Sequence, residues 1–439
     1  MLRACFVIDL IETADGPRIC EFGGFNSSHD IYRAATGASL LPRLFGDIVD
    51  AIAQTGPAPG CLIGHNMQLD ERNYPVHSFC ELWPDPGLKA VEEPDTINRA
   101  TPVFAFGYPY AAAGYAALKK KGFLNVVNAP ALELCLHNKA GLYHLGRPLL
   151  DPVLPKQVSC VIGDDPDASY KRIIDTVGVR DCYMFKRPDG GKGYGVMSVS
   201  LNGLMDRLVD IRDLSIFRGT PTIIVQEKLQ PLPIMLGEET FFPTIRLWCS
   251  VVDGPDGCPY PVVHTGYYKL SQYKSNISDA AFTTGWACNN DTDIVRKLIL
   301  DDDKSHDLWR AMAEYILPLI DGLSGVAVAD LVTALLRSDD VSARFLALDW
   351  IGAMPGGGGL GGADVTEALC RELEHAMADT SPMKPYLMTS GGQRLAINID
   401  RHFLNLGVDL YRPGRNDHVI GPMRFSRPPF MRTRPVPPS

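Results

Sequence analysis

A chain of 439 residues is too long for one ordinary hydrophobic core, and its 46% hydrophobic and 21% charged residues indicate a globular protein of two or three lobes. The formal charge of −9 argues against a nucleic-acid partner, because phosphate contacts need a basic surface. The scattered cysteines without a Cys-x-x-Cys pair, the lack of an apolar run as long as a membrane span, and the early Asp9 predict a cytoplasmic protein with neither a signal peptide nor a membrane partner.

The chain begins with the pattern of a β hairpin followed by a helix. Residues 4–11 form a strand pattern, an Asp-Gly pair is typical of a tight turn, and residues 18–22 predict the return strand. This hairpin would place Asp9 and Glu21 on neighbouring strands. An amphipathic helix is then predicted over 39–54.

The middle of the chain alternates short apolar runs with helical patterns, which is typical of an α/β or α+β protein. Strands are predicted at 103–106, 124–127, 158–162, 182–185, 196–199, 222–227, 244–252 and 262–270, and helices at 111–121, 130–147, 170–177, 201–209 and 308–323. A hairpin is predicted over 326–352, a helix over 364–379 and one more hairpin over 385–400. The Pro- and Arg-rich tail from 421 is predicted to run extended.

A glycine-rich stretch follows Lys186, which stands two residues before a proline at the end of a predicted strand. Glycine lets the backbone bend past a ligand, and successive inward N–H groups form an anion-binding concavity. The glycines of this loop are Gly190, Gly191, Gly193 and Gly195. The loop lacks the ending of a Walker motif and the spacing of a dinucleotide fingerprint. The pattern therefore indicates a phosphate-binding loop or, as the alternative, a plain hairpin with a solvated lysine.

Three further cations are candidates for contacts with phosphate. Lys139 lies in a predicted helix, and Arg246 and Lys269 lie in β-rich runs, where a charge is costly unless it is paired. Phosphoryl transfer needs cations and N–H groups fixed around the phosphates together with a divalent metal. The alternatives are a solvated helix face for Lys139 and a surface position on an edge hairpin for Arg246.

Taken together, these pieces resemble the ATP-grasp superfamily over about residues 130–355, and they are closest to the clade named for one arginine and two lysines. The resemblance implies an α+β fold of two lobes that bind ATP between them and use it to join a carboxylate to an amine through an acyl phosphate. It implies nucleotide contacts from Lys139, Lys186, the glycine loop and a hinge of Gln226, Glu227 and Lys228, and phosphate contacts at the catalytic centre from Arg246 and Lys269.

The resemblance also implies Mg²⁺, held by an Asp and then by a Glu-x-Asn motif on a returning strand. By order along the chain, the equivalent hairpin is 326–352, which offers Asp330 and Asp349 as ligands but has Ile351 in place of the Asn. Oxygen ligands of this kind suit Mg²⁺.

Two other hairpins offer rival ligands. The N-terminal hairpin offers Asp9 and Glu21, followed by Asn26, and the hairpin near the end of the chain offers Asn398 and Asp400. Three possibilities therefore stay open: the ordinary order with altered ligands, a composite site completed by the N-terminal hairpin, or a degenerate site.

The predicted organisation has five parts. These are a hairpin and helix (1–56), an α/β region (57–130), an ATP-grasp domain (131–355), a helix and hairpin (356–420) and the tail (421–439). The favoured function is an ATP-dependent ligase of a small-molecule or peptide carboxylate and an amine. The alternatives are a nucleotide-binding module without ligase activity and a phosphotransferase on the same fold.

Overall fold

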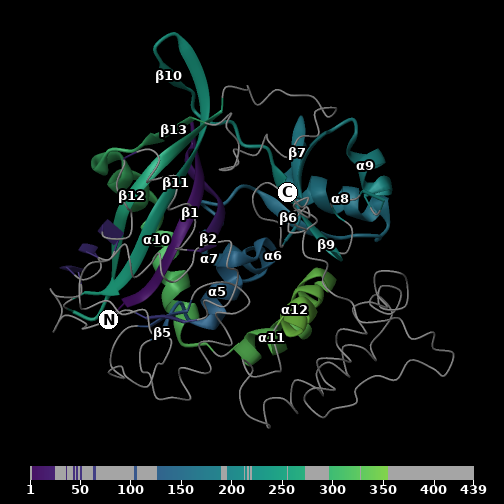
Figure 1. Cartoon of the computed structure of the whole chain (residues 1–439). Helices are drawn as coiled ribbons and strands as arrows, with labels where there is room; N and C mark the ends of the chain where they lie inside the picture. Colours follow the sequence, from purple (N-terminus) through teal and green to yellow (C-terminus); the bar gives the residue numbers. More distant parts are fainter. Residues whose placement is uncertain are drawn as a thin grey trace, which may run out of the picture. The chain divides into compact units, whose positions relative to one another are not determined.

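The computed structural model describes about half of the chain (Figure 1). The described residues are 2–24, 126–188, 195–211, 213, 214, 217, 220–254, 256–271, 296–326 and 328–353, with short pieces at 36, 43–44, 46–47, 50–51, 63–65 and 103–105. Residues Gly190, Gly191, Gly193, Asn26, Asn398 and Asp400, the segments predicted over 364–379 and 385–400, and the tail lie outside these ranges. The chain divides into two units, 1–331 and 332–439. In the described segments, no helix is long and apolar enough to cross a membrane.

The larger sheet joins the beginning of the chain to its middle. Its strands are β1 (Leu2–Thr13), β2 (Gly16–Gly24), β11 (Glu239–Asp253), β12 (Pro259–Ser271) and β13 (Arg296–Ile299), in the order β13-β12-β11-β1-β2, and β10 (Ile234–Leu236) pairs with β11. All of these pairs are antiparallel. The predicted N-terminal hairpin is confirmed, and it completes the sheet that β11 and β12 form much later in the chain.

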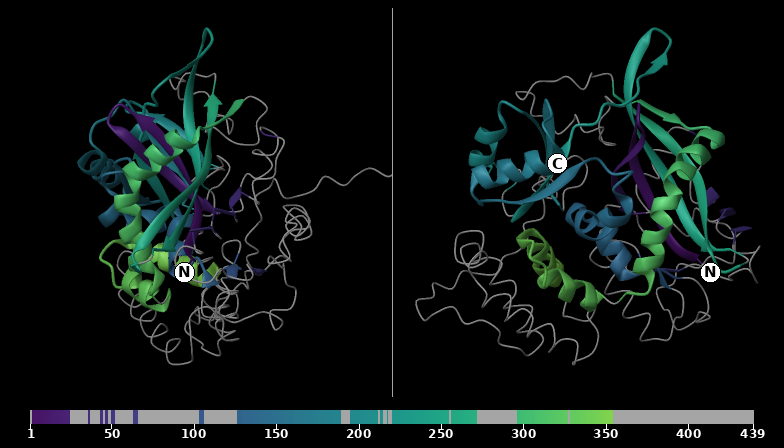
Figure 2. Two further views of the ribbon diagram at one scale, coloured as in Figure 1. Left: turned by 90° about the vertical axis from the view of Figure 1, so that its left-hand side faces the viewer. Right: turned by 180° about the vertical axis from the view of Figure 1, so that it is seen from behind.

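One face of this sheet is apolar and packs against α10 (Asp302–Ser324). Because side chains alternate along a strand, Phe6, Ile8 and Leu10 of β1 share that face, where they join the buried core with α10 residues such as Trp309 and Met312. The Asp301 carboxylate caps α10 by accepting from the Lys304 N–H at 2.6 Å. Figure 2 shows α10 lying along the sheet. Asp9, which lies between Ile8 and Leu10, is therefore left for the opposite face.

Gly266 is required where β12 crosses this core. An added Cβ would lie 2.5 Å from Leu247 Cδ2, 2.6 Å from Leu300 Cδ1 and 2.8 Å from the Arg246 carbonyl oxygen. Gly266→Ala is therefore expected to lower the free energy of unfolding by about 2 kcal/mol, the usual cost of overpacking. Gly322→Ala, in exposed helix with open space around it, is the control and should be neutral or stabilising. Denaturant titration of both variants measures this, and equal midpoints would contradict the overpacking.

The smaller sheet has the order β6-β9-β7-β8, and its strand pairs are also antiparallel. Its elements are β6 (Gln157–Val161), β7 (Cys182–Lys186), β8 (Val196–Ser200) and β9 (Thr222–Glu227), with α8 (Pro166–Val177) and α9 (Leu204–Asp210) packed on one face. The strands predicted in this part of the chain are confirmed. Alternation leaves Lys186, which follows the buried Phe185, on the face away from these helices.

A short helical segment precedes the smaller sheet. It consists of α5 (Pro130–His137), α6 (Lys139–Gly141), η2 (Leu142–Gly146) and α7 (Arg147–Leu150), and three short parallel strands come before it: β3 (Ile63–His65), β4 (Val103–Ala105) and β5 (Val126–Val127). Antiparallel sheets, a small parallel sheet and covering helices make this an α+β fold.

The hairpin predicted over 326–352 is wrong, because this segment forms the helices α11 (Val328–Leu336) and α12 (Val341–Ala353). Short apolar runs are compatible with either a strand or a buried helix. The spacing decides for helices, since the buried residues recur every three or four positions. They are Val328, Val332, Leu335 and Leu336 in α11, and Ala343, Leu346, Ala347 and Trp350 in α12, where Phe345 is buried as well. Asp330 is exposed on α11, and Asp349 lies within α12.

Candidate functional site

A buried cluster of charges lies on the face of the larger sheet that α10 does not cover. Asp9 of β1 pairs in register with Arg246 of β11, and Arg246 Nε and Nη2 each donate to one Asp9 carboxylate oxygen at 2.6 Å. Lys269 of β12 reaches across β11 and donates to Asp9 Oδ2 at 2.7 Å. Antiparallel pairing thus brings together two cations and one acid that are far apart in the sequence.

Pairing outweighs the effect of burial on the pKa of Asp9 and on that of Arg246, but not on that of Lys269. Burial by itself would raise the pKa of Asp9, but Arg246 and Lys269 hold it well below its usual range. Burial would lower the pKa of Arg246, but the neighbouring Asp9 raises it. The pKa of Lys269 is lowered by burial and by Arg246. A bidentate guanidinium–carboxylate pair of this kind fixes both side chains in orientation as well as in charge.

Glu21 and Lys139 extend the cluster. Glu21 pairs in register with Asp9 across β1 and β2, and its carboxylate lies 3.3 Å from Lys139 Nζ. Lys139 is the first residue of α6, and the Asn138 side chain caps this helix by accepting from the backbone N–H groups of Ala140 and Gly141. The backbone N–H of Lys139 donates to the Pro188 carbonyl at 3.0 Å. The solvated helix face considered for Lys139 is therefore excluded, because its side chain is only 10% exposed and is paired.

Lys186 brings the smaller sheet to the same cluster. It ends β7, where its backbone pairs with the neighbouring strands, but its side chain makes no hydrogen bond or ion pair within the described part of the chain. Burial lowers the pKa of Lys186, Lys139 acts in the same direction, and Cys20, Glu21 and Asp9 oppose them electrostatically. A partly buried ammonium with no bonded partner is suited to receive an anion.

Cys20 is a residue of this cluster that the sequence did not indicate. The pairing of β1 with β2 shifts between Asp9 and Leu10, so that Cys20 is the extra residue of a β-bulge beside Glu21. Burial raises the pKa of Cys20 to about 11, and Lys186 acts against this rise. The thiol is therefore uncharged near neutral pH and lines the site without adding a charge. No spacing rule identifies the extra residue of a bulge in a sequence. The one feature that could have indicated Cys20 is its position next to Glu21.

The predicted hinge lies at the end of β9. The Gln226 amide donates to the Gln157 side chain on the neighbouring β6. The Glu227 carboxylate accepts from the Lys156 backbone N–H at 2.8 Å and lies 3.0 Å from Arg180 Nη2. Lys228 follows directly, and α6 packs beside β9. The structure thus joins the hinge strand to the helix that carries Lys139, while the Glu227 carboxylate already holds two protein donors.

The carboxylates that could hold a metal fall into two groups. Asp9 and Glu21 lie opposite one another on paired strands, whereas Asp330 and Asp349 lie on two helices and share no hairpin. Across the described ranges, no group of three His, Cys, Asp or Glu side chains could form an all-protein metal cage. Two carboxylates on adjacent strands instead agree with the few protein ligands that Mg²⁺ needs, since it keeps waters and is bound through one or two carboxylates and substrate phosphates.

A separate chain of hydrogen bonds lies farther along the same sheet face. Ser250 Oγ is 2.7 Å from His264 Nε2, and His264 Nδ1 is 2.9 Å from Asp47 Oδ2. The spacing matches that of a nucleophile, a base and an orienting acid. However, Ser250 is fully buried in a strand, and its hydroxyl is also 3.2 Å from Cys5 Sγ. We interpret it as a structural network that ties Asp47 to β12.

This network predicts a pH dependence of stability. Burial lowers the pKa of His264 in the folded protein, although Asp47 acts against this. At a pH between the pKa of His264 in the folded protein and its ordinary value of about 6.5, the unfolded chain binds more protons than the folded protein. The stability that the neutral His264 contributes is therefore fully present above pH ~6.5 and is lost as the pH falls below that value. The melting temperature should therefore fall more steeply below pH ~6.5 in the wild type than in His264→Gln. Parallel slopes would contradict a neutral buried His264.

No protein-family model matches the sequence, and no curated protein matches it. Similar solved structures include a RimK-domain ATP-grasp protein from Sphaerobacter thermophilus, at 17% identity over 47% of this chain and 90% of that chain, with a TM-score of 0.26. D-alanyl-alanine synthetase A from Vibrio cholerae is 12% identical and D-cycloserine synthetase DcsG is 15% identical, each over 61% of this chain and 82% of theirs, with TM-scores of 0.35 and 0.33. Likenesses this low carry no argument about what this chain binds or does.

The chain's own architecture agrees with the resemblance that its motifs indicate. Two antiparallel sheets are present, and their strands carry Lys186, Arg246 and Lys269 into one cluster with Lys139. A relation to the ATP-grasp superfamily therefore stays the prediction that these motifs make.

Proposed function

We propose that this chain is an ATP-dependent ligase that joins a carboxylate to an amine through an acyl phosphate, with ATP and Mg²⁺ as cofactors. The observation that carries the proposal is the convergence of four cations and two carboxylates from two sheets and one helix. These residues are Lys139, Lys186, Arg246, Lys269, Asp9 and Glu21.

The cations would act on the phosphates. Transfer of a phosphoryl group needs positive charge fixed where negative charge develops, and a partly buried site makes each charge more effective. Lys186 and Lys139 would hold the nucleotide phosphates, while Arg246 and Lys269 would stabilise the transferred group and the acyl phosphate. A guanidinium keeps its charge at any working pH, so Arg246 is suited to a buried position.

Asp9 and Glu21 would hold the metal. Both are carboxylates on adjacent strands, and the Glu21 side chain is 35% exposed, so water and phosphate oxygens can complete an octahedral shell. When bound, Mg²⁺ would supply neutralisation of the phosphate charge. The proposal therefore adopts the composite site, in which the first hairpin of the chain completes a site whose cations come later.

The hinge residues Gln226, Glu227 and Lys228 would contact the nucleoside, and the substrates would be a small-molecule or peptide carboxylate and an amine. Gln226 and Glu227 are held by Gln157 and Arg180, so their positions are set before nucleotide binds. Such preorganisation lowers the entropy cost of binding.

The proposal is tested by ADP release from ATP with and without Mg²⁺, in the presence of an equimolar mixture of the twenty amino acids. Hydroxylamine is added in parallel, because it traps an acyl phosphate as a hydroxamate. Metal-dependent ADP release with hydroxamate formation supports the ligase. A stable phosphorylated product would indicate a phosphotransferase, and nucleotide binding without turnover would indicate a nucleotide-binding module.

A further inference from the structure

The Asp9 carboxylate occupies both cations that the proposed function assigns to the transferred phosphate. Each of its oxygens accepts from Arg246 at 2.6 Å, and one also accepts from Lys269 at 2.7 Å. The three side chains are 8%, 9% and 5% exposed, respectively, so water screens these contacts poorly. Lys186, by contrast, has no bonded partner in the described part of the chain.

This pairing places an acid where an anion must come. A phosphate approaching Arg246 and Lys269 would be repelled by Asp9, and it would have to replace two short charge-assisted hydrogen bonds from the guanidinium. A metal ion approaching Asp9 would in turn be repelled by the two cations. Neither partner alone relieves both conflicts, but a metal–phosphate complex carries a charge of each sign.

We propose that Asp9 is an internal competitor that makes nucleotide binding depend on the metal. By pairing with Arg246 and Lys269, Asp9 keeps metal-free polyphosphates away from them. Asp9 leaves these two cations and binds the metal only when the metal and the phosphates arrive together. The inference rests on the proposed function and adds a form of regulation to it: the site selects metal–nucleotide complexes over free nucleotides.

The surroundings allow this exchange without movement of the backbone. Strands β2, β1, β11 and β12 are paired through this region, and the opposite face of the sheet packs in the core with α10. The exchange is therefore a rotation of side chains over a rigid sheet. The bulge at Cys20 lies beside Asp9 on the β2 side, next to Glu21.

The test is the affinity for ATP measured by titration calorimetry, once with EDTA and once with excess Mg²⁺. Asp9→Asn removes the charge and keeps the shape. It is expected to bind metal-free ATP about tenfold more tightly than the wild type, because a like charge beside the anion is gone. The same variant is expected to bind MgATP about tenfold more weakly, because a metal ligand is lost.

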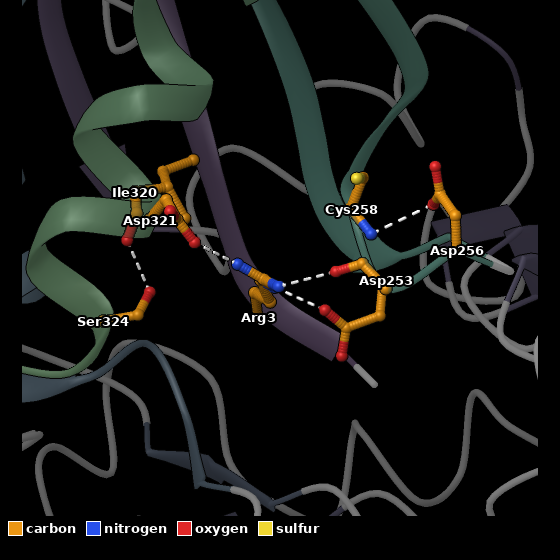
Figure 3. Close-up of polar contacts among 8 residues, drawn as sticks. Arg3, Asp253, Asp256, Cys258, Ile320, Asp321 and Ser324 are labelled. Atoms are coloured by element: carbon orange, nitrogen blue, oxygen red, sulfur yellow. Dashed lines mark hydrogen bonds and ion pairs between the residues drawn. The ribbon is translucent and has the colours of Figure 1, made fainter.

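Asp253→Asn is the matched control. Asp253 also lies on β11, and its carboxylate pairs with Arg3, which contacts Asp321 and the Gly257 carbonyl as well (Figure 3). This substitution removes the same charge from an ion pair of the same sheet, away from Asp9. It is expected to change neither affinity, which separates an effect of position from an effect of net charge.

A second comparison covers the case in which Asp9→Asn does not fold, since it leaves two buried cations without their acid. Lys269→Met is compared with Lys269→Met combined with Asp9→Asn, so that a single unpaired guanidinium remains. The double variant is expected to bind metal-free ATP more tightly than Lys269→Met alone.

Equal or weaker metal-free binding after loss of Asp9, in a wild type that binds MgATP, would overturn the competitor role and leave the proposed function standing. A wild type that binds neither form of ATP would overturn the proposed function, and the competitor role with it. Tighter metal-free binding together with weaker MgATP binding supports the exchange.

Discussion

Glu21→Gln is expected to lower Mg²⁺-dependent ATP turnover about a hundredfold, because the loss of residues that only support metal ligands already costs about 10- to 100-fold. Asp349→Asn is expected to leave turnover unchanged. Glu21 lies opposite Asp9 beside four cations, whereas Asp349 lies within a helix of the unit that begins at residue 332. The amide keeps the size of Glu21 but is a far weaker magnesium ligand than the carboxylate. Steady-state ADP release at saturating ATP measures both variants.

Glu12→Gln is the matched control for this comparison. Glu12 lies on β1 in the same hairpin, and its carboxylate is 2.6 Å from Lys304 at 27% exposure, which is close to the pairing of Glu21 with Lys139. Partly exposed ion pairs contribute about 1 kcal/mol or less to the free energy of unfolding, so both the Glu12→Gln and the Glu21→Gln variants should fold. Loss of turnover in Asp349→Asn but not in Glu21→Gln would refute the composite site. If neither mattered, the ligase proposal would have to give way to a nucleotide-binding module.

Lys186→Ala is expected to weaken ATP binding about a hundredfold, because a charge-assisted contact with phosphate contributes about 1.5–3 kcal/mol. The same change should not lower stability. Lys186 has no bonded partner among the described residues, and burial already opposes its charge. Calorimetric titration with MgATP gives the affinity, and a thermal melt without nucleotide gives the stability.

Lys171→Ala is the control for this second experiment. Lys171 lies on the exposed surface of α8 beside the smaller sheet and pairs with Asp175 one turn away. It should bind ATP like the wild type. A Lys186→Ala protein that folds and keeps its affinity would contradict the role of Lys186 and remove the smaller sheet from the phosphate site.

The sequence by itself determined most strands of both sheets. Alternating β-rich patterns and turn signals predicted β1, β2, β11 and β12, because the two-residue period of a half-buried strand is a local property. Lys186 could be named from the glycine loop that follows it. Arg246 and Lys269 could also be named from the sequence, since a cation inside an apolar strand needs a partner. Their partner could not be named, because the sequence does not state which strands become neighbours.

Tertiary structure alone decided which carboxylate lies among these cations. Three hairpins offered metal ligands, and chain order favoured Asp330 and Asp349. The segment that carries them has short apolar runs, which are compatible with either a strand or a buried helix. Only the packed structure shows that residues three and four positions apart are buried together, as in a helix. Asp9 entered the site because β1 pairs with β11, a contact between distant parts of the chain that buries the apolar face of both strands against α10. The hairpin that joins a sheet edge is the one that buries the most apolar surface in the whole fold. A local sequence pattern does not show how much surface will be buried.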